Sequence, residues 1–306
     1  MIVKKIIKYI KKHLFSFSII AISFFMFSCE KVEEKESLKK IAIVKFDSIL
    51  SFNEEVIGII DAIKHLSNGG KIDISVENSM GEVNKLNEII NKVIAKKPSV
   101  IVAISTPVAQ AFKKICDEKN IPLIFSSVTN AKIANLLHNY HQPENNVTGV
   151  EDFVSANDIV KLFKKYDSKK VGVLYNPNEV NSTYIIEKIK IHALSYGIEI
   201  FDILIENRND INNNMYPILD KLDALFISQD NLVVSFISDI VSKANEKNIP
   251  TFTSDIDLFS YGVTAAIGYP HRKLGYKAGE MAFRALSEGV EKIPAMHDVN
   301  IEIKIK

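Results

Sequence analysis

Hydroxyl, amide and carboxylate side chains follow the short β-branched segments of this sequence. The triplet Ser105-Thr106-Pro107 comes directly after an apolar run that ends at Ile104. A Ser or Thr followed by Pro is a typical helix start, and the free N–H groups at such a start suit an anion, for example a carboxylate. A hydroxyl that only caps its own helix explains the triplet equally well.

Two acids occupy comparable places in the second half of the chain. Asp230 and Asp255 each follow an apolar segment, in Ser228-Gln229-Asp230-Asn231 and Ser254-Asp255. They could neutralise an ammonium group, or they could only cap the segments that follow them. A helix-start anion site and two acids together are typical of a site for a zwitterion such as an amino acid.

The sequence lacks the common enzyme fingerprints. It contains no GxGxxG after a strand, no GxxxxGK[ST] and no GxSxG elbow, so dinucleotide, P-loop and esterase chemistry have no support. Histidines such as His138, His141 and His271 are interpreted as surface residues. Cys116 lies in a helical pattern and is interpreted as a small buried apolar side chain. No Cys/His cluster has zinc spacing, so we expect neither a metal nor a cofactor.

The elements that must position these side chains alternate regularly. Strand-like segments in the first half are 41–46, 72–76, 99–104 and 121–126, separated by helical periods at 56–66, 83–94 and 107–118. After a polar stretch at 138–146, strands at 170–175, 198–204, 224–228, 250–253 and 263–267 alternate with helices at about 182–196, 210–222 and 232–246. This βα alternation predicts an α/β fold with two doubly wound parallel-sheet lobes, joined by a hinge, and a cleft between the carboxyl ends of their strands.

The N-terminal segment has the layout of a secretory signal. Five lysines and no acid lie in the first 13 residues, about 14 apolar residues follow from Leu14 to Phe27, and Ser28-Cys29 ends the run. That run is shorter than the roughly 20 residues of a spanning helix. It resembles the bacterial lipoprotein signal, which implies a signal peptide at 1–28 and a lipid on Cys29; an uncleaved membrane anchor is the alternative. The charged stretch that completes 29–39 is expected to be a tether, so the fold would lie outside the cytoplasm, held at a membrane.

Charge argues against a nucleic-acid partner. The whole chain is +1, and removal of the five signal lysines leaves 33 basic against 37 acidic residues, about −4. No cluster of Lys and Arg stands out, so we expect no binding to nucleic acid.

Several motifs in order resemble one family. They are "VIVAISTPVAQAF" (100–112), "IPLIFSSVTN" (121–130), "NNVTGV" (145–150), "KKVGVLYNPNEVNS" (169–182), "QDNLVVS" (229–235), "IPTFTSD" (249–255) and "LGYKAGEMAFRAL" (274–286). Together they resemble the substrate-binding lipoproteins of ABC transporters in the tryptophan/tyrosine-type family. The resemblance covers nearly all of the chain from about residue 41.

The resemblance implies a periplasmic-binding-protein type I fold without enzyme activity. It implies a small-molecule ligand, commonly an aromatic amino acid, and delivery to a separately encoded permease and ATPase. The ligand-binding residues that it implies are Ser105, Thr106, Thr129, Tyr175, Asn176, Asp230 and Asp255. The first lobe would comprise 40–148 and about 272–290, and the second 149–270 and about 296–306. The sequence departs from the family at Asn130, where an acid is usual, and at Asp47-Ser48-Ile49-Leu50, which lacks the usual His-Pro.

Binding by hinge closure is the expected mechanism, because only a closed state lets both lobes contact the ligand. Phe46, Phe52 and Tyr175 could supply an aromatic wall or could be ordinary core residues. Three alternatives stay open: a ligand sensor of the same fold that signals to a receptor, a transcription regulator, and a surface enzyme. The regulator would need a DNA-binding unit where the signal segment stands.

Overall fold

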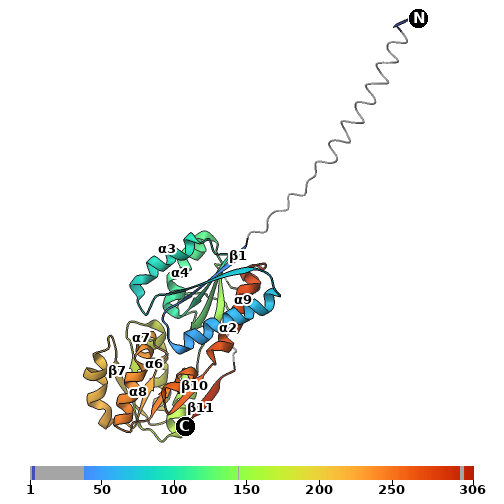
Figure 1. Ribbon diagram of the computed structural model, residues 1–306. Helices are drawn as coiled ribbons and strands as arrows, with labels where there is room; N and C mark the ends of the chain where they lie inside the picture. The colour runs from blue at the N-terminus through green and yellow to red at the C-terminus, as the bar shows by residue number, and fades with distance from the viewer. Residues whose placement is uncertain (1, 4–37, 144, 297–299) are drawn as a thin grey trace. The chain divides into compact units, whose positions relative to one another are not determined.

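The computed structural model describes residues 2–3, 38–143, 145–296 and 300–306. Nearly all of the expected signal peptide, Cys29 and nearly all of the tether lie outside the described residues. Residues 39–306 form one compact unit that contains two α/β lobes (Figure 1). Within the described residues, no helix is both long enough and apolar enough to span a bilayer.

The first lobe is built on five parallel strands in the order β2-β1-β3-β4-β5. Their bounds are β1 (Lys39–Lys45), β2 (Ile72–Asn78), β3 (Val100–Ile104), β4 (Leu123–Val128) and β5 (Val147–Glu151). Helices α2 (Leu50–Ser67) and α9 (His271–Ala285) cover one face, and α3 (Leu86–Ala95) and α4 (Thr106–Lys119) cover the other (Figure 1). All five residues of β3 are buried, as expected for a strand covered on both faces.

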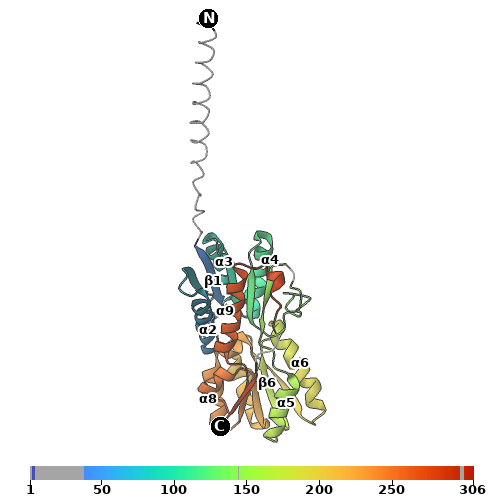
Figure 2. The same ribbon diagram turned by 90° about the vertical axis from the view of Figure 1, so that its right-hand side faces the viewer.

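The second lobe repeats the same winding. Its sheet has the order β11-β10-β9-β8-β6-β7, in which only β11 is antiparallel to its neighbour. The strands are β6 (Lys170–Tyr175), β7 (Glu199–Leu204), β8 (Ala224–Ile227), β9 (Thr251–Thr253), β10 (Ala265–Gly268) and β11 (Glu302–Ile305). Helices α5 (Ala156–Lys165) and α6 (Val180–Leu194) lie on the opposite face of the sheet from α8 (Ile237–Glu246) (Figure 2). Helix α7 (Asn231–Ser235) packs into the same core as α8. The predicted class of two doubly wound parallel-sheet lobes is confirmed.

Some predicted elements differ from the structure. The helix expected at 210–222 is a π-helical turn, Ile211–Met215, followed by a 3₁₀ helix, Tyr216–Lys221. Pro217 stands at the junction and cannot donate an α-helical backbone hydrogen bond. The helix expected at 232–246 is interrupted at Phe236. Strand β5 and helix α5 were not predicted among the elements. Further 3₁₀ turns occupy Val83–Lys85, Ile256–Tyr261 and Val290–Lys292.

Three chain segments connect the lobes. The chain leaves the first sheet after β5, returns from β10 to α9 through Tyr269-Pro270, and crosses again before β11. The Tyr269 hydroxyl donates to the Phe153 carbonyl over 2.7 Å, which ties the first two segments together. Met296 donates its N–H to the Gly149 carbonyl over 2.9 Å, which places the third beside β5. Residue 152, after β5, and residue 271, at the start of α9, therefore lie where the lobes meet.

Helices α2 and α9 are packed at backbone contact through glycine. A Cβ atom at Gly275 would lie 2.1 Å from the Glu55 carbonyl oxygen, and one at Gly58 would lie 2.1 Å from the Arg272 carbonyl oxygen. Neither backbone can yield without separating the helices. This close crossing holds the Glu55 and His271 side chains at the junction of the lobes.

We expect Gly275→Ala to lower the free energy of unfolding by about 1–3 kcal/mol, because overpacking a closed core costs this much. Urea unfolding followed by circular dichroism measures the effect. Lys277→Ala on the same helix is the control, since it removes only the surface ion pair with Glu280. Equal stability of Gly275→Ala and the unchanged protein would contradict the packing described here.

Cys116 is fully buried in the core of the first lobe, as predicted. Burial raises the pKa of its thiol to about 12. A thiol that stays protonated at neutral pH is a poor nucleophile, so Cys116 is a packing residue.

Candidate functional site

The site follows from the order of the strands. Each sheet has a topological switch point, at which the strand order reverses. It lies between β1 and β3 in the first lobe and between β6 and β8 in the second. Ligands of doubly wound sheets bind outside the carboxyl ends of the strands at this point. A cavity lies there between the lobes, and we call it the small cavity. Its lining consists of Ile49, Phe52, Thr106, Ser127, Thr129, Asp152, Asn181, Gln229, Asp230, Asn231, Val234, Asp255 and His271.

A second cavity, here the large cavity, adjoins the first. It also lies between the lobes, and Asn181 belongs to both linings. Its remaining lining is Phe46, Gly81, Val83, Asn84, Leu86, Asn87, Pro107, Gln110, Ala111, Asn176, Asn178, Glu179, Val180 and Leu232.

Four of the seven predicted ligand-binding residues line the small cavity: Thr106, Thr129, Asp230 and Asp255. Asn176 lines the large cavity. The structure does not bring the other two to either lining. Ser105 is buried just before α4, and its hydroxyl neither caps the helix nor finds a partner among the described residues. Tyr175 packs against the core of the second lobe, beside Asp202.

Both acids from the second lobe also serve as helix caps. Asp230 Oδ1 accepts the N–H groups of Leu232 and Val233 over 3.0 and 2.9 Å. Asp255 Oδ1 accepts the Asp257 N–H over 3.0 Å, and its Oδ2 accepts the Ser51 hydroxyl over 2.5 Å. The capping and the binding interpretations are therefore compatible for these residues.

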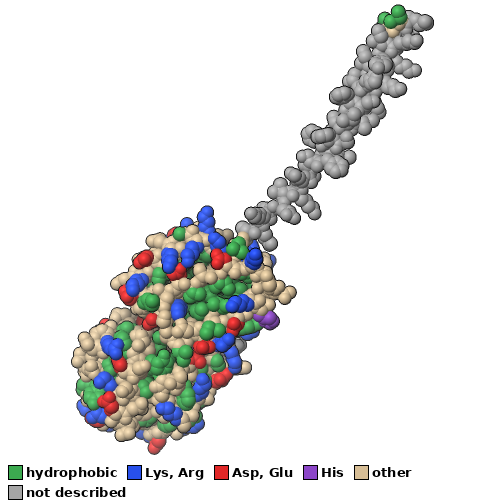
Figure 3. Space-filling view, viewed as in Figure 1, with side chains coloured by type: hydrophobic (Ala, Val, Ile, Leu, Met, Phe, Trp, Pro, Cys, Tyr) green, Lys and Arg blue, Asp and Glu red, His purple; other side chains and the backbone are tan. Residues whose placement is uncertain are grey.

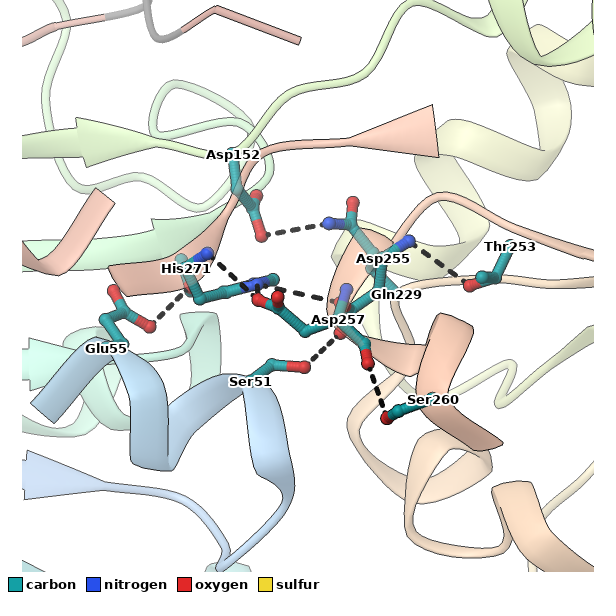
Figure 4. Close-up of polar contacts among 10 residues, drawn as sticks. Ser51, Glu55, Asp152, Gln229, Thr253, Asp255, Asp257, Ser260 and His271 are labelled. Carbon is teal, nitrogen blue, oxygen red and sulfur yellow. Dashed lines mark hydrogen bonds and ion pairs between the residues drawn. The ribbon is translucent and has the colours of Figure 1, made fainter. Parts of the chain in front are cut away.

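A cluster of charged side chains lies at the junction of the lobes. It consists of Glu55, Asp152, Asp255, Asp257 and His271, which point toward one another in Figure 4. His271 Nδ1 lies 2.8 Å from Asp257 Oδ2 and 3.6 Å from Asp255 Oδ1. Four acids thus surround one base, and Lys and Arg are absent from the described lining of the small cavity.

Two oxygens of this cluster lack a hydrogen-bond partner among the described residues. Glu55 is fully buried, and its Oε2 accepts the Ser127 hydroxyl over 2.7 Å while its Oε1 is unpaired. Asp152 is 4% exposed, and its Oδ2 accepts Gln229 Nε2 over 3.4 Å while its Oδ1 is unpaired. Unpaired buried acceptors are costly. Of these two acids only Asp152 lines the small cavity, so its oxygen favours a ligand donor there.

Burial shapes the protonation of the cluster. It raises the pKa of Glu55 to about 7 and that of Asp152 to about 6, although the charge of His271 lowers both in part. For His271, burial alone would lower the pKa, but the carboxylates of Asp255, Asp257 and Glu55 raise it to about 10. Burial also acts on Asp257, yet its bonds with His271 hold its pKa below the ordinary value. A histidinium at neutral pH with acids in excess leaves net negative charge for a cationic group.

The prediction that the histidines are surface residues is wrong for His271, which is 2% exposed. It begins α9 directly after Pro270, and the crossing brings it against acids from other elements. Glu55 and Asp152 were also missed. Asp152 follows β5, a strand that was not predicted, and Glu55 lies on a helix face that only the crossing with α9 buries. For Asp152, its position after the apolar stretch Val147-Thr148-Gly149-Val150 was an available signal.

The ligand-free protein is expected to be less stable at pH 9 than at pH 5. Folded Glu55 and Asp152 keep their protons up to about pH 7 and 6, whereas the unfolded groups release them near 4.5 and 3.8. Folded His271 holds its proton to about pH 10, against 6.5 when unfolded. Stability therefore falls as the pH rises through both windows, by several kcal/mol in order of magnitude. Urea unfolding at the two pH values measures it, and a rise in stability toward pH 9 would contradict this electrostatic description.

Comparison with known proteins agrees with this architecture. The family model described as "ABC transporter substrate binding protein" matches residues 40–302. A tyrosine-binding protein of Clostridioides difficile is 32% identical over 269 residues, which cover 86% of this chain and 77% of that protein.

Two solved structures cover the chain to the same extent. One is the ABC domain in complex with L-Trp from Streptococcus pneumonia, with a TM-score of 0.82 and 26% identity over 88% of this chain and 92% of that one. The other is the ligand-free, open structure of a substrate-binding protein with adhesive properties from Clostridium difficile, with a TM-score of 0.66 and 30% identity over the same shares. The resemblance noted in the sequence is thereby confirmed. Because the family model extends over nearly the whole described unit, this chain belongs to the ABC transporter substrate-binding protein family.

Proposed function

We propose that this protein binds a free amino acid with an aromatic side chain between its lobes, outside the cytoplasm, and delivers it to the permease and ATPase of an ABC importer. The observation that carries the proposal is the cluster of buried acids at the small cavity. Asp152 presents an unpaired buried oxygen there, and the described lining supplies no Lys or Arg to neutralise it. An α-ammonium group donates three hydrogen bonds and carries the missing positive charge.

The first lobe supplies partners for the carboxylate of the same ligand. Thr106 begins α4, a helix of 14 residues, and lines the small cavity. The N–H groups and dipole at this helix start favour an anion. The Thr129 hydroxyl lines the cavity nearby, and Phe52 offers an aromatic surface. An anion site on one lobe and acids at the junction fit a zwitterion.

The arrangement of the lobes supports binding by closure. Overall similarity is greater to the L-Trp complex, with a TM-score of 0.82, than to the open, ligand-free structure, with 0.66, although the open structure has the higher sequence identity. Side chains from both lobes reach each other: Ser51 of α2 donates to Asp255 of the second lobe. A ligand that contacts both lobes shifts the population toward such a closed state.

The ligands of two similar proteins support the class of ligand. One relative is a tyrosine-binding protein and one solved structure holds L-Trp. The proposed location outside the cytoplasm is supported by the N-terminal sequence, in which lysines are followed by an apolar run and Cys29. We propose that 1–28 is removed as a signal peptide, that Cys29 carries a lipid and that 29–39 tethers the lobes to the membrane.

Thermal unfolding of the purified full chain in detergent, across the standard amino acids, tests the proposal. A ligand at about 100 times its Kd adds about 2.7 kcal/mol to stability, which corresponds to a rise in Tm of roughly 5–10 °C. We expect tyrosine, tryptophan or phenylalanine to give such a rise and aspartate to give none. Absence of a response to all three aromatic amino acids, or turnover of any of them, would overturn the proposed function.

A further inference from the structure

The two adjoining cavities differ greatly in size. The small cavity holds about 20 Å³, room for one water-sized group such as an ammonium. The large cavity holds about 710 Å³, within the ~300–1,000 Å³ of sites that enclose drug-sized ligands. The acids therefore surround only the head of a ligand, and most of the free space lies beside them.

The two cavities are continuous in their linings. Asn181 lines both, and Thr106 of the small cavity immediately precedes Pro107 of the large one. Asn176 of the large cavity donates its backbone N–H to Asp230 Oδ2 of the small cavity over 2.7 Å. A ligand whose ammonium group occupies the small cavity would extend between α4 and the start of α6 into the large one.

Carboxamides are the characteristic polar groups of the large cavity. They are Asn84, Asn87, Gln110, Asn176, Asn178 and Asn181. A carboxamide both donates and accepts hydrogen bonds, and so complements the N–H and C=O groups of a peptide bond. Three of the six amide groups already donate within the protein, those of Gln110, Asn178 and Asn181, which leaves their oxygens as acceptors. Between these amides lie apolar side chains, including Leu86 from the first lobe and Leu232 from the second, which suit uncharged side chains.

The charge of the large cavity restricts its ligand further. Among its described lining residues, Glu179 alone is charged. Both oxygens of that carboxylate are bonded, Oε2 to the Asn231 amide over 2.6 Å and Oε1 to the Leu232 N–H over 3.3 Å. A charged ligand side chain would find no free partner of opposite charge in this lining, so the space favours an uncharged body.

We propose that the site also accepts short peptides with a free N-terminus and uncharged side chains. The first residue would bind as the free amino acid does, with its ammonium in the small cavity and its carbonyl at the start of α4. The peptide bond and the side chain of the second residue would occupy the large cavity between the lobes. The terminal carboxylate would reach the edge of that cavity at Asn84 and Asn87, which are exposed to solvent. This inference rests on the proposed function and extends it to a further class of ligand.

Calorimetric titration of the full chain with tyrosine, tyrosyl-alanine and tyrosyl-glutamate tests the inference. We expect tyrosyl-alanine to bind with a Kd within tenfold of that of tyrosine, and tyrosyl-glutamate to bind at least tenfold more weakly than tyrosyl-alanine. Tyrosine binding without any binding of tyrosyl-alanine would overturn the inference and leave the proposed function standing. Absence of binding by all three would overturn both.

A variant of the large cavity makes the test specific. Asn87 is an exposed residue of α3 at this lining, and Asn87→Phe would narrow the cavity without disturbing the core. It should lower the affinity for tyrosyl-alanine relative to that for tyrosine at least tenfold. Asn91→Phe, one turn further along the same helix and outside the lining, is the control and should leave the ratio unchanged. If the affinity for tyrosyl-alanine relative to tyrosine is the same in both variants, the second residue does not bind in the large cavity.

Discussion

Asp152→Asn is expected to weaken the binding of a zwitterionic amino acid about 30-fold or more. Asn has nearly the same shape and can still accept the Gln229 amide through its oxygen, but it carries no charge. Truncating one partner of a buried, hydrogen-bonded charge pair costs about 2–5 kcal/mol of binding free energy. Isothermal titration calorimetry at pH 7.5 gives the ratio of the two Kd values.

The same substitution should stabilise the ligand-free protein at pH 7.5. Burial raises the pKa of Asp152 to about 6, so the ionised form is disfavoured in the fold, and asparagine removes that penalty. A variant that binds the ligand more weakly but is more stable without it distinguishes a ligand-binding acid from one that only supports the structure. Asp158→Asn on α5, where the acid pairs with Lys161 at the surface, is the matched control. A loss of stability together with unchanged affinity would assign Asp152 a structural role.

His271→Gln is expected to destabilise the protein by about 3–5 kcal/mol at pH 8. His271 is the one base in the buried cluster, and its removal leaves Asp255 and Asp257 without a positive charge within hydrogen-bond reach among the described residues. Removing one partner of a buried ion pair carries a cost of this size. Urea unfolding at pH 8 measures the loss.

The pH dependence of that loss is the more specific signature. At pH 4 the acids of the cluster take up protons, so the variant should recover part of the stability that it lacks at pH 8. His138→Gln is the control, because His138 is exposed and should be replaceable at little cost. A deficit that is equal at both pH values would mean that His271 acts through packing rather than through charge.

The fold could be predicted because its determinants are local. Apolar strand segments alternate with helical periods, and parallel sheets covered on both faces need continuous apolar strands such as β3. The prediction failed for elements whose secondary structure depends on tertiary contacts. Strand β5 is five residues long and follows a polar stretch, and Pro217 divides a segment with helical spacing.

The site could be predicted in part, for the same reason. Thr106, Thr129, Asp230 and Asp255 follow strands or start helices, and topology alone brings strand ends to one edge of a sheet. Glu55 and His271 lie on two helices whose contact depends on Gly58 and Gly275. Nothing in the local pattern of either helix indicates that its charged residue is buried. Tyr175 illustrates the converse, since its place at a strand end does not bring it to a cavity.

The surface carries its charge differently from the interior. On the face shown in Figure 3, Lys and Arg side chains are interspersed with Asp and Glu. Elsewhere and on this face, exposed Lys and Arg side chains form ion pairs with acids that contribute little to stability, as Arg284 does with Glu288. The buried cluster differs, because four acids there face a single histidine. The low dielectric of the interior strengthens its attraction for a cation. Recognition of the ligand is therefore expected to depend on that cluster more than on the surface.

One comparison tests the central claim most directly: calorimetric titration of the protein with tyrosine and with N-acetyltyrosine at pH 7.5. The two ligands share a ring and a carboxylate, and only the first has an ammonium group for the buried acids. We expect tyrosine to bind and N-acetyltyrosine to bind at least about 30-fold more weakly, in line with the loss of a buried charged partner. Equal affinities, or preference for the acetylated ligand, would contradict an ammonium site at Asp152 and Asp255.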